Sequence, residues 1–148
     1  MNYLTMTFIT ILSGMAIATQ SGMSGQISRI LNNPLLAALM IYVSSALFIT
    51  IGILTLGVEI PELKLVKSIP LHLWFSGGIL SVLGLSCVYW LMPKMGVPNV
   101  LVGVIFGQVV ISMIAGHFGW FDLPVTLFNV QKLIGTMFLV VGIVLINK

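Results

Sequence analysis

Charged residues are nearly absent from this sequence, and their scarcity constrains the fold more than any other feature. Only 6% of the 148 residues are charged, while 59% are hydrophobic. Soluble domains carry charge on roughly a quarter of their residues, because charged side chains cover the surface that faces water. A chain with so few of them cannot cover such a surface. We therefore expect an integral membrane protein that crosses the bilayer several times.

The apolar residues fall into five segments, each long enough for a transmembrane helix of about 20 residues. Proline, glycine, asparagine and most charged residues lie in the connections. The segment "RILNNP", for example, offers Asn32 or Asn33 as a helix N-cap and places Pro34 in the next first turn. We predict one all-α transmembrane domain over residues 1–148, with spans at about 3–28, 34–57, 70–92, 98–118 and 129–146.

The basic residues give the chain no preferred orientation in the membrane. Five spans place the two termini on opposite sides, and an excess of Lys and Arg normally marks the cytoplasmic side. The six basic residues divide evenly, with Lys64, Lys67 and Lys132 on the N-terminal side and Arg29, Lys94 and Lys148 on the other. Either this balance arises by chance, or the chain inserts in both orientations. In the second case two copies would form an antiparallel homodimer of ten helices.

Polar residues gather on one face of the first span. On a helical projection of about 100° per residue, this stripe comprises Thr10, Ser13, Gln20, Ser21, Ser24 and Ser28, with Gly14 and Gly25 at its border. An unpaired amide in lipid costs several kcal/mol, so Gln20 should face protein or water. Small residues also let helices approach closely. The stripe is either a packing seam or the lining of a polar cavity, and the two interpretations are compatible.

The fourth span carries a second polar face within "GQVVISMIAGHFGW", residues 107–120. Gln108, Ser112 and Gly116 follow one another at intervals of four residues and therefore share a face. Two polar-faced helices in one short chain favour a shared polar interior. The residues that we expect to line a substrate pathway are Gln20, Ser24, Gln108, Ser112 and His117.

Glycines on other faces are expected to serve close helix packing. Gly103 and Gly107 form a small-xxx-small pair nearly opposite the polar face of the fourth span. Gly77 and Gly78 are the corresponding candidates in the third span.

His117 has two interpretations, because it lies near the end of the fourth span beside aromatic residues. It is either an interfacial histidine of an aromatic belt or a titratable group within reach of the pathway. Glu59, Glu62 and Asp122 all lie in connections, so proton coupling through an intramembrane group would have to use His117.

Several function classes have no support in the sequence. It contains no catalytic motif, and Cys87 is the sole cysteine, so we expect neither an enzyme nor a cysteine-based metal site. The scattered basic residues do not form a nucleic-acid surface. We expect no cofactor, no metal and no nucleic acid, and as partners only the lipid bilayer, a small-molecule substrate and a second copy of the chain.

Six stretches, in this order along the chain, resemble the YdcZ-type family of the drug/metabolite transporter superfamily. They are "Q" at 20, "NPLLAAL" at 33–39, "WFSGGIL" at 74–80, "MPKMGV" at 92–97, "GQVVISMIAGHFGWF" at 107–121 and "KLIGTMFLVVGIVLI" at 132–146. The resemblance implies a small transporter of the plasma or inner membrane, in some members an antiparallel dimer and in others a pair of fused or paired halves. It supplies no substrate.

The chain departs from this family at two positions. Members typically have Asp immediately before the His-Phe-Gly of the fourth span, where this chain has Gly116. Members often have Asn four residues after the first-span Gln, where this chain has Ser24. The missing acid puts any coupling through a carboxylate in doubt.

These observations predict a transporter half-unit that moves a small molecule, working as a dual-topology antiparallel homodimer. Two alternatives remain. The polar faces could be packing contacts of a non-transporting membrane subunit, or the chain could be a passive channel or facilitator.

Overall fold

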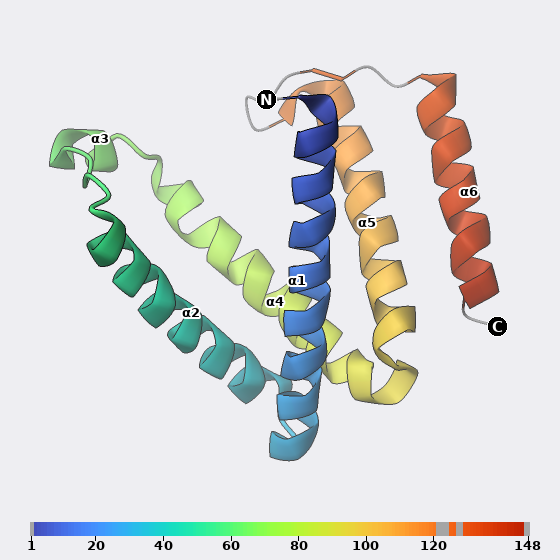
Figure 1. The fold of residues 1–148 in the computed structure, drawn as a ribbon, viewed down its shortest axis with the longest axis horizontal. Helices are drawn as coiled ribbons and strands as arrows, with labels where there is room; N and C mark the ends of the chain where they lie inside the picture. The colour runs from blue at the N-terminus through green and yellow to red at the C-terminus, as the bar shows by residue number, and fades with distance from the viewer. Residues whose placement is uncertain (1, 121–124, 127–128, 147–148) are drawn as a thin grey trace. The chain divides into compact units, whose positions relative to one another are not determined.

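The computed structural model describes residues 2–120, 125–126 and 129–146 (Figure 1). Every regular element among them is a helix, as the composition predicts. The chain divides into two compact units, unit 1 (residues 1–94) and unit 2 (residues 95–148). Asp122 and Lys148, which the sequence places in a connection and beyond the last span, lie outside the described residues.

Within the described residues, four helices are long and apolar enough to cross a membrane. They are α1 (Tyr3–Leu31), α2 (Pro34–Leu56), α4 (Leu71–Met95) and α5 (Val97–Phe118). A fifth apolar helix, α6 (Val130–Ile146), has 17 residues and a length of about 26 Å, slightly less than a hydrocarbon core of about 30 Å. The bounds of all five helices agree with the predicted spans to within three residues.

The turn between α1 and α2 forms as "RILNNP" predicts. Asn32 ends α1 in the left-handed region at φ 49°, a conformation that asparagine tolerates better than most residues. Asn33 is the N-cap, and its Oδ1 accepts hydrogen bonds from the backbone N–H groups of Leu35 (2.9 Å) and Leu36 (3.2 Å). Pro34 occupies the first turn, where its missing N–H removes no helical hydrogen bond.

Asn33→Ala is expected to lower the free energy of unfolding by about 1 kcal/mol, because two N–H groups of α2 lose their acceptor. Thermal unfolding of the detergent-solubilised protein should show a midpoint lower by a few degrees, about 2–4 °C for a chain of this size. The control is Asn32→Gly, which preserves the left-handed turn and should leave the midpoint nearly unchanged. Equal effects of the two substitutions would contradict this account of the turn.

The third predicted span continues three residues farther than expected. The helix passes the approximate predicted end at Met92, because Pro93 lies within the last turn of α4, where it removes one backbone hydrogen bond without ending the helix. The chain leaves the helix at Gly96, which adopts a φ of 84°. The charged connection before α4 also contains a short helix, α3 (Leu63–Lys67).

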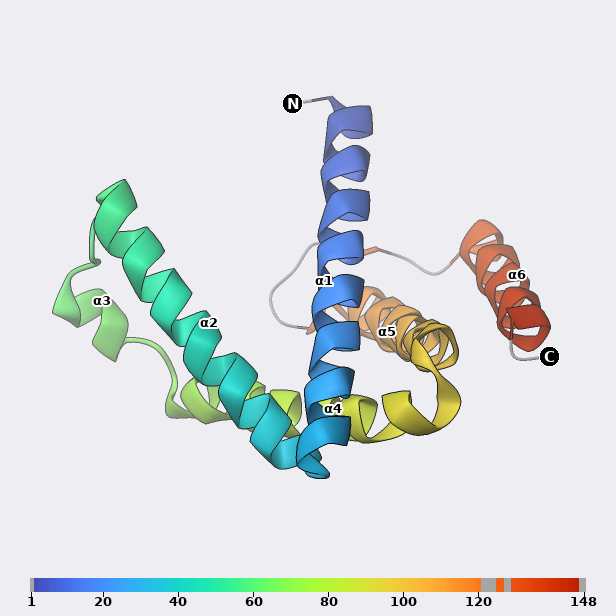
Figure 2. The ribbon, with the colours of Figure 1, turned by 60° about the horizontal axis from the view of Figure 1, so that its bottom comes forward.

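Unit 1 has a small core where the end of α1 meets the start of α2 and the second half of α4. Ala37, Ala38 and Tyr89 are fully or almost fully buried. From this junction α1 and α2 diverge (Figures 1 and 2). Gly25 allows the close approach of α1 to α4, since a Cβ at this position would lie 2.9 Å from the Cβ of Met92. The core therefore holds the helices together at one end of the unit.

Unit 2 consists of α5, α6 and the described residues between them. Val100 and Ala115 of α5 are buried. The backbone N–H of Thr126 donates to the carbonyl oxygen of Gly116 at 3.0 Å, which fastens this part of the connection to α5. Asn129 caps α6 by accepting a hydrogen bond from the backbone N–H of Lys132 at 2.9 Å.

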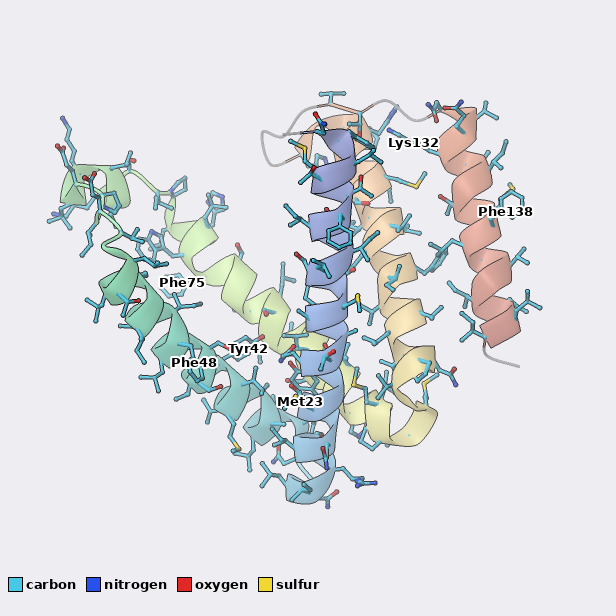
Figure 3. The ribbon with its side chains drawn as sticks, viewed as in Figure 1. Met23, Tyr42, Phe48, Phe75, Lys132 and Phe138 are labelled. Atoms are coloured by element: carbon cyan, nitrogen blue, oxygen red, sulfur yellow. The ribbon has the colours of Figure 1, made fainter. Side chains whose placement is uncertain are left out.

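Large apolar side chains remain exposed on both units. In unit 1 Leu54 is 75% exposed, and in unit 2 Phe138, which points away from α5 in Figure 3, is 71% exposed. Such surfaces are stable in contact with lipid or with another apolar chain.

Candidate functional site

Gln20 on α1 is the centre of a polar cluster in unit 1. Its Nε2 donates to Ser24 Oγ at 3.0 Å and to the hydroxyl oxygen of Tyr89 at 3.2 Å. The Ser24 hydroxyl in turn donates to the backbone oxygen of Gln20 at 2.8 Å. We call Gln20, Ser24 and Tyr89 the Gln20 cluster. It joins α1 to α4 by side-chain hydrogen bonds.

The Gln20 cluster lies deep in the apolar part of the unit. Ser24 and Tyr89 are fully buried, and Gln20 is half-buried. Gln20 is eleven residues before the end of α1, or about 16 Å along the helix, close to half of a hydrocarbon core of about 30 Å. Its side-chain oxygen accepts no hydrogen bond from any described residue. An acceptor at this depth is available to a ligand or to a second chain.

The rest of the α1 stripe divides into two parts. Ser21, Ser24, Gly25 and Ser28 are buried, as a packing seam requires. Thr10 and Ser13 are exposed, and their hydroxyls donate to backbone oxygens four residues earlier in the same helix. The second half of the stripe is thus a packing seam with Gln20 at its edge, while unit 1 leaves the first half uncovered.

Tyr89 was not predicted as a site residue, although it is the partner of Gln20. Tyr89 lies eight residues after Ser81, so these two hydroxyl-bearing side chains lie on one face of α4. Ser81 is itself hydrogen-bonded to the hydroxyl of Tyr42 on α2, which points toward α4 in Figure 3. The eight-residue spacing of two hydroxyl side chains is the signal that could have identified this face.

A second set of polar side chains lies in unit 2, around a cavity between α5 and α6. A cavity of about 440 Å³ is lined by Ser112, Thr126, Lys132 and Thr136 together with apolar side chains. The Lys132 ammonium donates to the backbone oxygen of Thr126 at 3.3 Å, and the Thr136 hydroxyl donates to Met113 Sδ at 3.1 Å. In Figure 3 Lys132 lies at the start of α6.

The structure places the predicted pathway residues in two groups. Gln20 and Ser24 lie together in unit 1, and Ser112 lies at the cavity of unit 2. Gln108 is exposed on α5. His117 is also exposed, with its ring 5.2 Å from that of Phe118 in an edge-to-face arrangement.

The glycines expected to serve packing lie in open positions. A Cβ at Gly77, Gly78, Gly103 or Gly107 would meet no described atom within 4 Å. The described part of the chain therefore supplies no close partner for these glycines, and the packing expected there remains a prediction.

Gly116 has a close neighbour instead. A Cβ at this position would lie 2.6 Å from Thr126 Oγ1, closer than real side chains approach. The space beside residue 116, where the resembling proteins carry an acid, is therefore filled by Thr126 in this chain.

Comparison with known protein families identifies a match over nearly the whole chain. The family model DMT_YdcZ, described as "Putative inner membrane exporter, YdcZ", matches residues 5–145. Comparisons with curated proteins and with solved structures give no match.

Proposed function

Because this chain belongs to the YdcZ family of inner membrane proteins described as exporters, we propose that it exports a small molecule as an antiparallel pair of copies. In this proposal all five apolar helices cross the membrane, so that the termini lie on opposite sides. The Gln20 cluster of each copy contributes to the substrate site. The two copies rock against each other to expose this site to either side in turn.

The observation that carries the proposal is the side-chain oxygen of Gln20, near the middle of α1, to which no described residue donates a hydrogen bond. A polar group at this depth is costly unless it is paired, so its unfilled hydrogen-bonding capacity favours a functional role. The matching substrate is a small molecule with a hydrogen-bond donor. Ser112 and the cavity of unit 2 offer further hydroxyl groups for a polar substrate.

The second copy is supported by surfaces that unit 1 leaves uncovered. Every residue from Asn2 to Ile17 is exposed, including Thr10, Ser13 and Gly14 of the polar stripe. The open glycines of α4 and α5 would likewise allow close approach of another helix. The even distribution of Lys and Arg agrees with insertion in both orientations.

A second candidate function is passive facilitation, which the contact between Gly116 and Thr126 favours. Thr126 fills the space where the resembling proteins carry a carboxylate that could bind a proton. A facilitator would use the same site without coupling to the proton gradient.

Efflux from liposomes tests export and distinguishes it from facilitation. Vesicles containing purified protein are loaded with a mixture of cellular metabolites, and the released solutes are identified by mass spectrometry. We expect at least one solute to leave faster than from protein-free vesicles. For a proton-coupled exporter, the steady-state solute gradient across the vesicle membrane should change about tenfold per unit of pH difference for each coupled proton. For a facilitator, the solute gradient should not depend on the pH difference. Equal release of every solute from both kinds of vesicle would overturn the proposal.

A further inference from the structure

Beyond export, unit 1 contains a basic hollow at one end of α1 and α4. Its volume is about 230 Å³, and its polar lining residues are Ser28, Arg29, Asn32 and Lys94. One water molecule needs about 10–15 Å³ in such a hollow, so the space admits a phosphate-sized group. We call this hollow the Arg29 pocket.

No acidic residue in the described part of the chain balances the charge of the Arg29 pocket. Neither Arg29 nor Lys94 forms a salt bridge with any described residue. The acidic residues of unit 1 are Glu59 and Glu62, which follow the far end of α2, while Asn32 and Asn33 precede its near end. A helix of 23 residues, about 34 Å long, separates the acids from the pocket. Two cations that line one hollow repel each other unless an anion lies between them.

The polar side chains that line the pocket can all donate hydrogen bonds. Ser28 is only 4% exposed, yet its hydroxyl forms no hydrogen bond with any described residue, and it lines the pocket. The Lys94 ammonium lies 3.3 Å from the centre of the Trp90 ring, and this cation–π contact holds it beside the hollow. Arg29 presents a planar guanidinium that matches two phosphate oxygens at once.

We propose that Ser28, Arg29, Asn32 and Lys94 bind a phosphate group at this face of the membrane. The helix ends place the pocket at the level of lipid headgroups, and Trp90 is a residue typical of that interface. The phosphate belongs either to an anionic lipid headgroup or to a soluble phosphate compound. Stabilisation of the helix ends would explain the two cations alone. It would not explain why Ser28, which is only 4% exposed, lines the same hollow with a hydroxyl that has no hydrogen-bond partner among the described residues.

Native mass spectrometry of the full-length protein tests the proposal with two probes, phosphatidylglycerol and inorganic phosphate. The test variant is R29Q/K94Q, and the matched control is K64Q/K67Q, which removes two exposed cations from the connection around α3 on the opposite side of the membrane. Each double substitution leaves one basic residue against three, so the two variants disturb the orientation balance equally and differ in the Arg29 pocket. S28A removes the hydroxyl and retains both charges. We expect R29Q/K94Q to bind phosphatidylglycerol at least about tenfold more weakly than wild type, as for the loss of one charge-assisted hydrogen bond. S28A should also weaken binding, and the control should bind as wild type does.

The two probes distinguish the source of the phosphate. Binding of phosphatidylglycerol that inorganic phosphate does not displace supports the proposal and assigns the site to a lipid headgroup. Displacement by inorganic phosphate, again dependent on Arg29 and Lys94, supports it and assigns the site to a soluble compound. Failure of both probes to bind, or equal binding by R29Q/K94Q and wild type, would overturn it. Because the measurement is binding and not flux, its outcome is independent of the proposed export.

Discussion

Gln20→Leu is expected to lower the rate of solute efflux from proteoliposomes at least about tenfold. Leucine has a similar size but removes both the hydrogen bonds to Ser24 and Tyr89 and the free acceptor that we assign to the substrate. A lost hydrogen bond to the substrate that leaves a buried partner unpaired costs about 1–3 kcal/mol, and 1.4 kcal/mol corresponds to a factor of ten. The measurement is the initial efflux rate of the solute identified by mass spectrometry.

The matched control for this substitution is Gln26→Leu. Gln26 lies on the same helix but is exposed, outside the Gln20 cluster. This variant should transport at nearly the wild-type rate. Thermal unfolding of both variants in detergent separates a transport defect from loss of folding. Equal efflux rates for Gln20→Leu and wild type would refute the role of Gln20 in the pathway.

The second large effect concerns the orientation of the chain in the membrane. We expect a few charges in the connection around α3 to decide this orientation. K64Q/K67Q leaves one basic residue on the N-terminal side against three on the other, whereas E59K/E62K gives five against three. Since the side richer in Lys and Arg stays in the cytoplasm, the two variants should insert in opposite single orientations. All four positions are exposed, so the substitutions should leave the helices intact.

The orientation is measured by the accessibility of a C-terminal tag to protease in intact cells. For wild type we expect two populations, one cleaved and one protected. K64Q/K67Q should place the C-terminus entirely inside, and E59K/E62K entirely outside. A wild-type tag that is wholly cleaved or wholly protected would contradict dual insertion and indicate an oriented chain that pairs with a sibling.

Local sequence signals predicted the helices closely, because hydropathy and turn residues act within one segment. The N-cap at Asn33 and the proline after it specify the start of α2 regardless of tertiary context. The end of α4 lies three residues beyond the predicted one, because hydropathy and turn residues do not fix how far a helix runs past a proline. A proline in the last turn costs one hydrogen bond, and the helix continues to the glycine that can adopt a positive φ.

Only the α1 residues of the candidate site could be predicted from the sequence. Gln20 and Ser24 stand out because amide and hydroxyl groups are unusual in an apolar helix. Their partner Tyr89 is 69 residues from Gln20 along the chain, and nothing in the local sequence links the two. Likewise the proximity of Gly25 to Met92 and of Gly116 to Thr126 depends on how separate segments pack, which helical periodicity alone does not specify.

Export by the two oppositely oriented variants tests the antiparallel exporter most directly. Efflux of the identified solute is measured in cells that produce K64Q/K67Q alone, E59K/E62K alone, or both together. The antiparallel arrangement predicts little efflux from either variant alone and restored efflux when both are present in one membrane. Wild-type efflux from cells that contain only one variant, with its single orientation verified by the tag, would contradict it.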